Sequence, residues 1–196
     1  LEKITKTAEE FRGITLGEFK KIYLNDKKRT YTYSSMLQYK NALNKFEDLY
    51  NTPLAELGYI NIKPCVDKMI DTGLKPSTIT DYLKRLRNVL GHAMYKYKIL
   101  PDNPIKIKDY DFKKEKKEKI NALNKNQCEI LFNNLDGKDY YICLLALKCG
   151  LRAGEVVGLT DLSFDFKKGV VIIDKQWKKL GHKKHGFGAP KSINSY

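Results

Sequence analysis

ALKCGLRAGEVVGL, residues 146–159, places one arginine inside a largely apolar segment with glycines close to it. Because a guanidinium is always charged, burying Arg152 without a partner costs several kcal/mol. The fold is therefore expected to supply a carboxylate or a bound anion, and Glu155 lies one helical turn further on. We expect Gly150 to end an apolar helix in the left-handed conformation and Arg152 to open a new short helix. Helix N-terminal amides and guanidinium donors together suit a phosphate group.

The composition favours an anionic partner. The 196 residues carry a formal net charge of +14, and 42% of them are hydrophobic, enough for one sizeable core or two small ones. A field of this sign favours nucleic acid or an anionic membrane surface, although an ordinary basic surface is the alternative. No apolar run approaches the ~18 residues that span a bilayer, and the N-terminus lacks the apolar core of a signal peptide. We therefore expect a cytoplasmic protein without a membrane anchor.

The cysteines and histidines do not indicate a disulfide framework or a metal site. The cysteines lie at wide, irregular spacings within apolar stretches and are expected to be reduced core thiols: Cys65, Cys128, Cys143 and Cys149. His182 and His185 could bind a metal on a helix, but no cysteine or carboxylate accompanies them, so a basic loop is the preferred interpretation. We expect no metal and no cofactor.

The first half of the chain has the apolar periodicity of a helical bundle. Its caps and breakers are Thr32 as an N-cap, Gly73 as a stop and Pro76 in a first turn. Short links between helices favour a small bundle. Four helices are predicted over residues 15–24, 32–50, 59–72 and 75–99, with Tyr33, Met36, Leu37, Leu43, Phe46 and Leu49 as the inward stripe of the second.

The second half begins after a charge-dense stretch, 106–119, which is expected to be an extended linker. Asn124 or Asn126 is expected to cap a helix that runs through Phe132, and residues 140–149 are apolar enough for a central core helix. The spacing of apolar residues then changes from that of a helix to that of extended chain. This predicts strands over 162–166 and 169–174, followed by a loop over 181–188.

Two stretches resemble one known family. GLRAGEVVGL, residues 150–159, is similar to the first signature box of the tyrosine recombinase (phage integrase) family, G-L-R-x-G-E with two hydrophobic residues and a leucine. KPSTI at 75–79, with the helix after it and LPDNPI at 100–105, resembles the last helix and Asn-Pro turn of that family's core-binding domain. The resemblance implies a mainly α fold. A SAM-like helical bundle, the core-binding domain, would span residues 1–105. A linker would follow over 106–119. Residues 120–196 would form the N-terminal part of an α+β catalytic domain with a small antiparallel sheet.

The resemblance also implies site residues. PKSINS, residues 190–195, matches the context of the family's catalytic lysine, which makes Lys191 the candidate beside Arg152, with Glu155 in support. Ser163 stands where the family usually has an aspartate. The family's H-x-x-R box and tyrosine nucleophile are missing from this sequence, and Tyr196 lies too close to the lysine to replace that tyrosine. We therefore expect a fragment of a longer enzyme.

The implied reaction is metal-free DNA strand cleavage and rejoining through a 3′-phosphotyrosine, with Arg152 stabilising phosphate charge and Lys191 protonating the leaving oxygen. The expected partner is double-stranded DNA, on which copies of the intact protein would self-associate. The candidate DNA contacts on the helical bundle are Arg29, Ser35, Gln38, Lys75, Ser77, Thr78, Lys84 and Arg87. A non-catalytic DNA-binding or regulatory protein is the alternative, and a basic helical scaffold for protein partners is a third.

Overall fold

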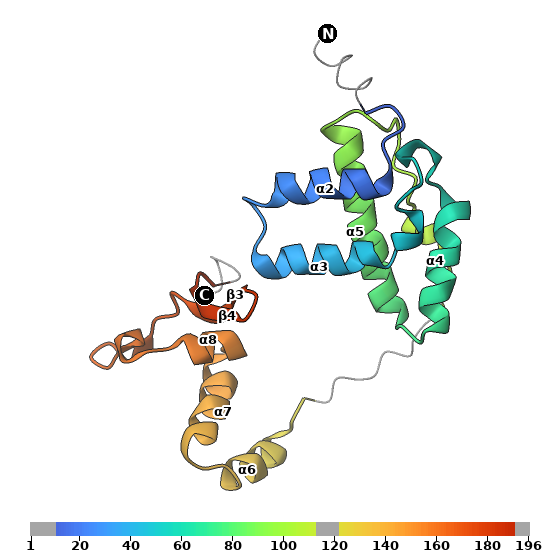
Figure 1. Cartoon of the computed structure of the whole chain (residues 1–196). Helices are drawn as coiled ribbons and strands as arrows, with labels where there is room; N and C mark the ends of the chain where they lie inside the picture. Colours follow the sequence, from blue (N-terminus) through green and yellow to red (C-terminus); the bar gives the residue numbers. More distant parts are fainter. Residues whose placement is uncertain (1–10, 113–121, 191–196) are drawn as a thin grey trace. The chain divides into compact units, whose positions relative to one another are not determined.

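The computed structural model describes residues 11–112 and 122–190, and the chain divides into two compact units, Leu1–Lys116 (unit 1) and Lys117–Tyr196 (unit 2). Both appear in Figure 1, and each is described by itself. Unit 1 is helical, and unit 2 combines helices with two small antiparallel sheets. The predicted fold class, mainly α with an α+β second part, is therefore confirmed.

Capping residues fix where the first helices of unit 1 begin. The Thr15 hydroxyl accepts from the Glu18 N–H at 3.3 Å, while the Glu18 carboxylate accepts from the Thr15 N–H at 2.9 Å, a capping box. The Thr32 hydroxyl accepts from the Ser35 N–H at 3.2 Å, as predicted for an N-cap. Helix α5 packs against each of the other three helices (Figure 1). These helices are α2 (Leu16–Lys27), α3 (Tyr33–Asn44), α4 (Tyr59–Asp71) and α5 (Pro76–Tyr95).

The core of unit 1 is centred on α5. Ile79, Leu83, Leu86 and Leu90 repeat every three or four residues along that helix, and all are fully buried. Fully burying a side chain of this size stabilises the fold by about 1.5–3 kcal/mol. The other helices complete this core with Leu16, Phe19, Tyr23, Leu43, Ile62, Cys65, Val66 and Met69.

Two predicted helices of unit 1 end earlier than their apolar pattern. Helix α3 stops at Asn44, and Phe46 and Leu49 reach the core from a turn and a 3-10 helix, Glu47–Leu49. Leu37, predicted to face inward, is 37% exposed. Helix α5 stops at Tyr95, because the chain turns back through Lys98, whose φ is +56°. The spacing of apolar residues therefore predicted most of the core residues correctly, but it did not predict where these two helices end.

The segment expected to begin an extended linker instead packs on unit 1. Residues 107–109 form a 3-10 helix, and Tyr110 is only 5% exposed, with its ring centroid 5.3 Å from that of Tyr59. The reason is local: Ile105, Ile107, Tyr110 and Phe112 alternate with the charges and bury against the core. The remainder of the predicted linker, 113–119, lies outside the described residues.

In unit 2 the start of α6 and the end of α7 match the sequence signals, whereas α7 begins at Gly137, three residues before its predicted start. The Asn124 side chain accepts from the Gln127 N–H at 2.9 Å and caps α6 (Lys125–Asn133). Helix α7 (Gly137–Cys149) ends at Gly150, which has the predicted left-handed conformation at φ +67°. The short helix α8 (Ala153–Gly158) then leads into the strands. These are β1 (Phe164–Asp165) paired with β2 (Val170–Val171), and β3 (Gln176–Gly181) paired with β4 (Lys184–Gly188).

Helix α7 differs from its prediction as a central core helix. Its side chains are half-buried or exposed in the described structure, with Tyr141 63% and Leu147 52% exposed. The cysteines differ in the same way: Cys65 is a buried core thiol, whereas Cys149 is exposed and the other two are half-buried. The apolar pattern of α7 predicts an apolar surface, but it does not show whether another part of the chain buries that surface.

The predicted loop 181–188 is a β-hairpin. Strands β3 and β4 pair in antiparallel register, and the rings of Trp177 and Phe187 meet edge to face across them at 5.1 Å. His182 and Lys183 form the two-residue turn, with Lys183 at φ +55°. Within the described ranges, no group of three or more potential metal ligands occurs. No helix of those ranges is long and apolar enough to cross a membrane.

Candidate nucleic-acid interface

Arg152 stands at the junction between α7 and α8. Gly150 ends α7, Leu151 is buried, and Arg152 is the residue before the first turn of α8. Its Nη1 donates to Glu155 Oε1 at 3.0 Å, and its backbone N–H donates to Glu155 Oε2 at 2.9 Å. Glu155 therefore holds both the backbone and the guanidinium of Arg152.

Arg152 is not buried as predicted, whereas its partner Glu155 is. Glu155 is 4% exposed, whereas the Arg152 side chain is 58% exposed. The hydrogen bond from the Arg152 backbone lowers the pKa of Glu155, burial opposes it, and the Arg152 side chain lowers it further. Glu155 is therefore a carboxylate at neutral pH. Of the five guanidinium donors of Arg152, the described residues engage one, so the rest of the fork is open to a ligand.

Glycines bring α8 directly onto β3. A Cβ on Gly158 would lie 2.9 Å from Gln176 Cα, and one on Gly154 would lie 3.0 Å from the Trp177 carbonyl oxygen. The distance at Gly158 is too short for a real side chain, so this position needs glycine, and at Gly154 a side chain would fit only if β3 moved by a few tenths of an ångström. The turn of chain that carries Arg152 and Glu155 is thereby fixed on the sheet.

The candidate lysine, Lys191, lies outside the described residues. The chain just before it is anchored to the same strand that supports α8. The Ala189 carbonyl accepts from Gln176 Nε2 at 2.7 Å and from Lys178 Nζ at 3.0 Å. Strand β3 therefore contacts both α8 and the chain at residue 189.

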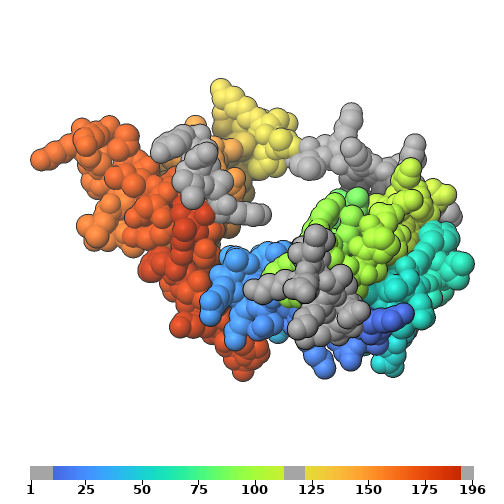
Figure 2. Space-filling view, turned by 90° about the horizontal axis from the view of Figure 1, so that it is seen from above, coloured from blue at the N-terminus to red at the C-terminus, as the bar shows by residue number. Residues whose placement is uncertain are grey.

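In unit 1, three of the eight candidate DNA contacts line one hollow between α3 and α5. Gln38 comes from α3, and Ser77 and Thr78 come from the first turn of α5. The hollow has a volume of about 270 Å³. Figure 2 shows the surface at which the light-blue α3 and the green α5 meet. Arg85, which sequence reasoning missed, crosses this hollow and donates to Gln38 Oε1 at 2.8 Å and to the Asp81 carbonyl at 3.1 Å.

The other candidates are spread over the same unit. Lys84 is exposed and lies 3.7 Å from the Asp81 carboxylate. Ser35 belongs to the cap of α3, and its hydroxyl lies 3.0 Å from that of Thr32. Lys75 stands at the N-cap position of α5 and makes no side-chain capping bond. Arg29 lines a hollow at the end of α2, and Arg87 lines a separate one. Five of the eight predicted contacts therefore do not line the hollow between α3 and α5.

Sequence reasoning also missed a charged network between α2 and α5. Asp26 Oδ2 lies 2.8 Å from each of His92 Nε2, Lys96 Nζ and the Tyr97 hydroxyl. Burial raises the pKa of Asp26, but hydrogen bonds from Lys96, His92 and Tyr97 outweigh it and lower the pKa to about 2. These partners lie 66 to 71 residues away in the chain, so no local pattern could have indicated them.

Comparison with known proteins finds neither a matching family model nor a matching curated protein. Solved structures of the Tn1549 transposon integrase do match. The complex with transposon right end DNA has a TM-score of 0.73 and 21% identity over 91% of this chain and 58% of that chain. A complex with a circular intermediate DNA has a TM-score of 0.76 and 20% identity over the same shares of the two chains.

A second circular-intermediate complex gives a TM-score of 0.73 and 20% identity, covering 90% of this chain and 59% of that chain. This chain thus spans less than two thirds of each of these integrase chains. The likeness extends over most of its length and shows that it has the integrase fold.

Proposed function

We propose that this chain binds duplex DNA and supplies part of the cleavage site of a tyrosine-type site-specific recombinase. The observation that carries the proposal is the fold shared, over 91% of the chain, with an integrase in complex with DNA. Within that fold, Arg152 presents an open guanidinium that a buried carboxylate holds in place. A planar fork held in this way suits two oxygens of one phosphate.

The face formed by α3 and α5 supports DNA binding in unit 1. The hollow between these helices gathers hydroxyl, amide and guanidinium groups, with Ser77, Thr78, Gln38 and Arg85 among them. Such groups can contact phosphates or base edges in the major groove. Lys75, Lys84 and Arg29 add exposed cations suited to phosphates, and the net charge of +14 favours association with a polyanion.

In the proposed reaction, a tyrosine oxygen bonds to phosphorus while the bond from phosphorus to the 5′ oxygen breaks. Arg152 stabilises the charge on the non-bridging oxygens, and the Lys191 ammonium gives its proton to the departing 5′ oxygen. Glu155 positions Arg152 and is a poor base, because both of its oxygens accept hydrogen bonds from Arg152 and its pKa is lowered. The tyrosine, a second arginine and assembly of several copies on DNA belong to the longer protein that we propose contains this chain.

The test is DNA binding by the 196-residue chain, measured by fluorescence anisotropy with a labelled mixed-sequence duplex over a range of salt concentrations. The affinity should fall linearly on a log–log plot against salt. Lys84→Gln should reduce the slope by about one and the affinity by about threefold to tenfold.

Lys63→Gln is the matched control. Lys63 also pairs with a carboxylate of its own helix, Asp67, but it lies on α4, and Figure 1 shows α4 and α3 on opposite sides of α5. This variant should keep the salt slope of the unaltered chain. A flat salt response of the unaltered chain, or equal losses in the two variants, would contradict the proposed interface.

A further inference from the structure

A half-buried glycine, Gly91, lies in the last third of α5. Gly91 has four further helical residues after it, and its φ is not positive, so the backbone does not require glycine there. Glycine inside a helix is unfavourable relative to alanine, because it loses more backbone freedom on folding. Gly91 therefore weakens the helix at the centre of unit 1's core.

The packing of the described chain gives no reason for this glycine. A Cβ at Gly91 would meet only Asn103 Nδ2, at 3.5 Å, an ordinary van der Waals distance. The other glycines inside helices contrast with it: a Cβ on Gly17 would lie 3.0 Å from the Tyr50 carbonyl oxygen, and Gly154 and Gly158 are packed as tightly on β3. Glycine allows a partner to approach a backbone closely, and nothing in the described chain does so at Gly91.

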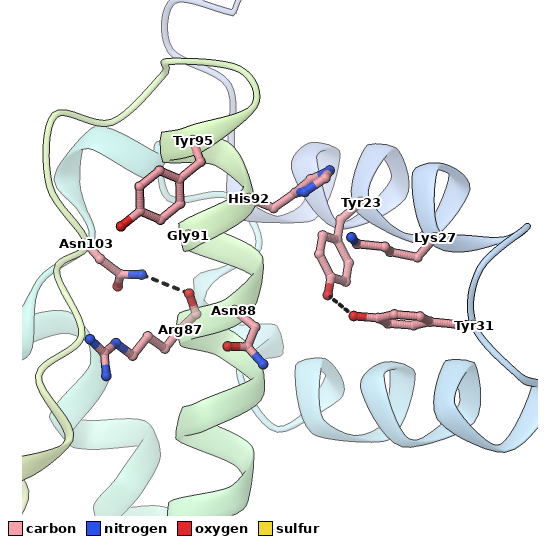
Figure 3. A pocket seen from close by; sticks show the side chains of 9 residues that line it. All are labelled: Tyr23, Lys27, Tyr31, Arg87, Asn88, Gly91, His92, Tyr95 and Asn103. Carbon is pink, nitrogen blue, oxygen red and sulfur yellow. Dashed lines mark hydrogen bonds between the residues drawn. The ribbon is translucent and has the colours of Figure 1, made fainter. Parts of the chain in front are cut away.

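The surroundings of Gly91 are cationic and aromatic. It lies in a hollow of about 490 Å³ on α5, which Figure 3 shows from close by. Tyr95, Asn103 and Arg87 lie on one side of α5, and Tyr23, Lys27 and Tyr31 lie on the other (Figure 3). None of the residues that line the hollow is a carboxylate, and among the described residues neither Lys27 nor Arg87 has an ion-pair partner.

Hydrogen bonds fix the walls of the hollow. Asn103 Nδ2 donates to the Arg87 carbonyl at 2.8 Å and so holds the Asn-Pro turn against α5. The hydroxyls of Tyr23 and Tyr31 lie 3.1 Å apart, and Lys27 Nζ lies 5.6 Å from the centroid of the Tyr31 ring. The cations therefore flank a helix surface whose shape is set before any ligand arrives.

We propose that the sugar–phosphate backbone of the bound duplex passes over α5 at Gly91, with Lys27 and Arg87 as its flanking phosphate contacts. This inference rests on the proposed DNA binding and adds to it the point of closest approach. Two cations that have no ion-pair partner among the described residues suit a chain of phosphodiesters. The nearby carboxylate of Asp26 is already engaged by His92, Lys96 and Tyr97. The missing side chain at Gly91 gives that chain room to lie against the helix.

The experiment compares Gly91→Ala with the unaltered 196-residue chain in thermal unfolding, followed by circular dichroism, and in anisotropy binding to the mixed-sequence duplex. Alanine is the better helix former, so the Tm of unit 1 should rise by about 2–8 °C. The added methyl group should nevertheless weaken DNA binding by about fivefold to twentyfold. A gain in stability with a loss of binding is not expected of a residue that serves only the fold.

Ile60→Ala is the matched control, because Ile60 is 84% exposed on α4 and alanine again favours the helix. It should leave DNA affinity unchanged. Arg87→Gln and Lys27→Gln should each lower the salt slope by about one.

Three outcomes would overturn the inference. They are a lower Tm in Gly91→Ala, which would mean that the fold needs the glycine; unchanged DNA affinity in that variant; and tighter binding of a single strand than of the duplex. If the unaltered chain does not bind DNA at all, the proposed function itself fails, and the inference fails with it.

Discussion

Unit 1 buries the apolar faces of helices α2 to α5 against one another, whereas unit 2 leaves most of its apolar side chains at the surface. In unit 1 the core runs from Leu16 to Tyr110. In the described part of unit 2, the buried hydrophobic residues are Leu151 and Val156, and both flank the Arg152–Glu155 pair. Unit 1 therefore has the packing of a domain that is stable alone, while unit 2 packs tightly only around its charged pair.

The units also differ in how they treat charge. In unit 1, Asp26 pairs with His92 on α5 and with Lys96 directly after it, so its contacts join α2 to the end of α5. In unit 2, Glu155 accepts from a residue three positions before it, so the pair orients one side chain locally. The long-range pairs of Asp26 thus help to hold unit 1 together, whereas the local pair in unit 2 orients the Arg152 side chain at the surface.

The largest expected effect tests whether unit 2 carries the chemistry. In a longer protein that contains these residues and a tyrosine nucleophile, Arg152→Lys keeps the charge but loses the planar fork. Strand cleavage should fall by about 10²- to 10³-fold, the scale of losing one preorganised donor at a reacting oxygen. DNA affinity should change little, because other cations share the duplex. Equal losses of affinity and of cleavage would contradict this separation of roles.

The next effect tests the difference in packing. Leu83→Ala at a fully buried position of α5 should lower the free energy of unfolding of unit 1 by about 2–5 kcal/mol. Leu147→Ala, the same change at a 52% exposed position of α7, should alter stability by less than about 0.5 kcal/mol. Urea unfolding followed by circular dichroism measures both. A large loss in Leu147→Ala would show that α7 is covered in solution.

A smaller effect tests the one tightly packed place in unit 2. Gly158→Ala should destabilise that unit by about 1–3 kcal/mol, because the new methyl group would force α8 away from Gln176. Trp177 is the only tryptophan of the chain and lies at this contact, so its fluorescence reports the unfolding of unit 2. Unit 1, followed by circular dichroism, should unfold at an unchanged urea concentration. If Gly158→Ala is neutral, α8 does not lie directly on β3.

The smallest effect concerns pH. The pKa of Asp26 is about 2 in the folded chain, below its ordinary value, so its stabilisation is present above pH ~4 and is lost as the pH falls through about 2. Asp26→Asn should therefore cost about 1 kcal/mol at neutral pH, after allowance for solvent screening, and almost nothing near pH 2. Asp81→Asn, whose carboxylate has only an exposed partner 3.7 Å away, is the control and should cost less than about 0.5 kcal/mol. A cost in Asp26→Asn that does not depend on pH would contradict the assigned network.

Local signals predicted the parts of this fold that local interactions make. Thr32, Asn124 and Gly150 cap or end helices as predicted, because each acts on residues within one turn. The β3–β4 hairpin was missed, since its glycines and lysines are typical of a loop and its stabilising pair, Trp177 with Phe187, forms only after the strands meet.

The candidate site divides in the same way. The contact of Arg152 with Glu155 followed from their spacing, but their burial did not, since burial depends on β3 beneath α8. The hollow around Gly91 joins α2, α5 and the Asn-Pro turn, and no single stretch of sequence contains it. Lys191 stays a prediction.

The central place of α5 also sets the order in which unit 1 can fold during synthesis. Helices α2, α3 and α4 each pack on α5, which is the last of the four to leave the ribosome. Until residues 76–95 have emerged, Phe19, Leu43 and Val66 lack the surface that buries them in the native state. Because contacts across such sequence separations must wait for loop closure, the nascent N-terminal helices stay exposed to chaperones and proteases until α5 joins them.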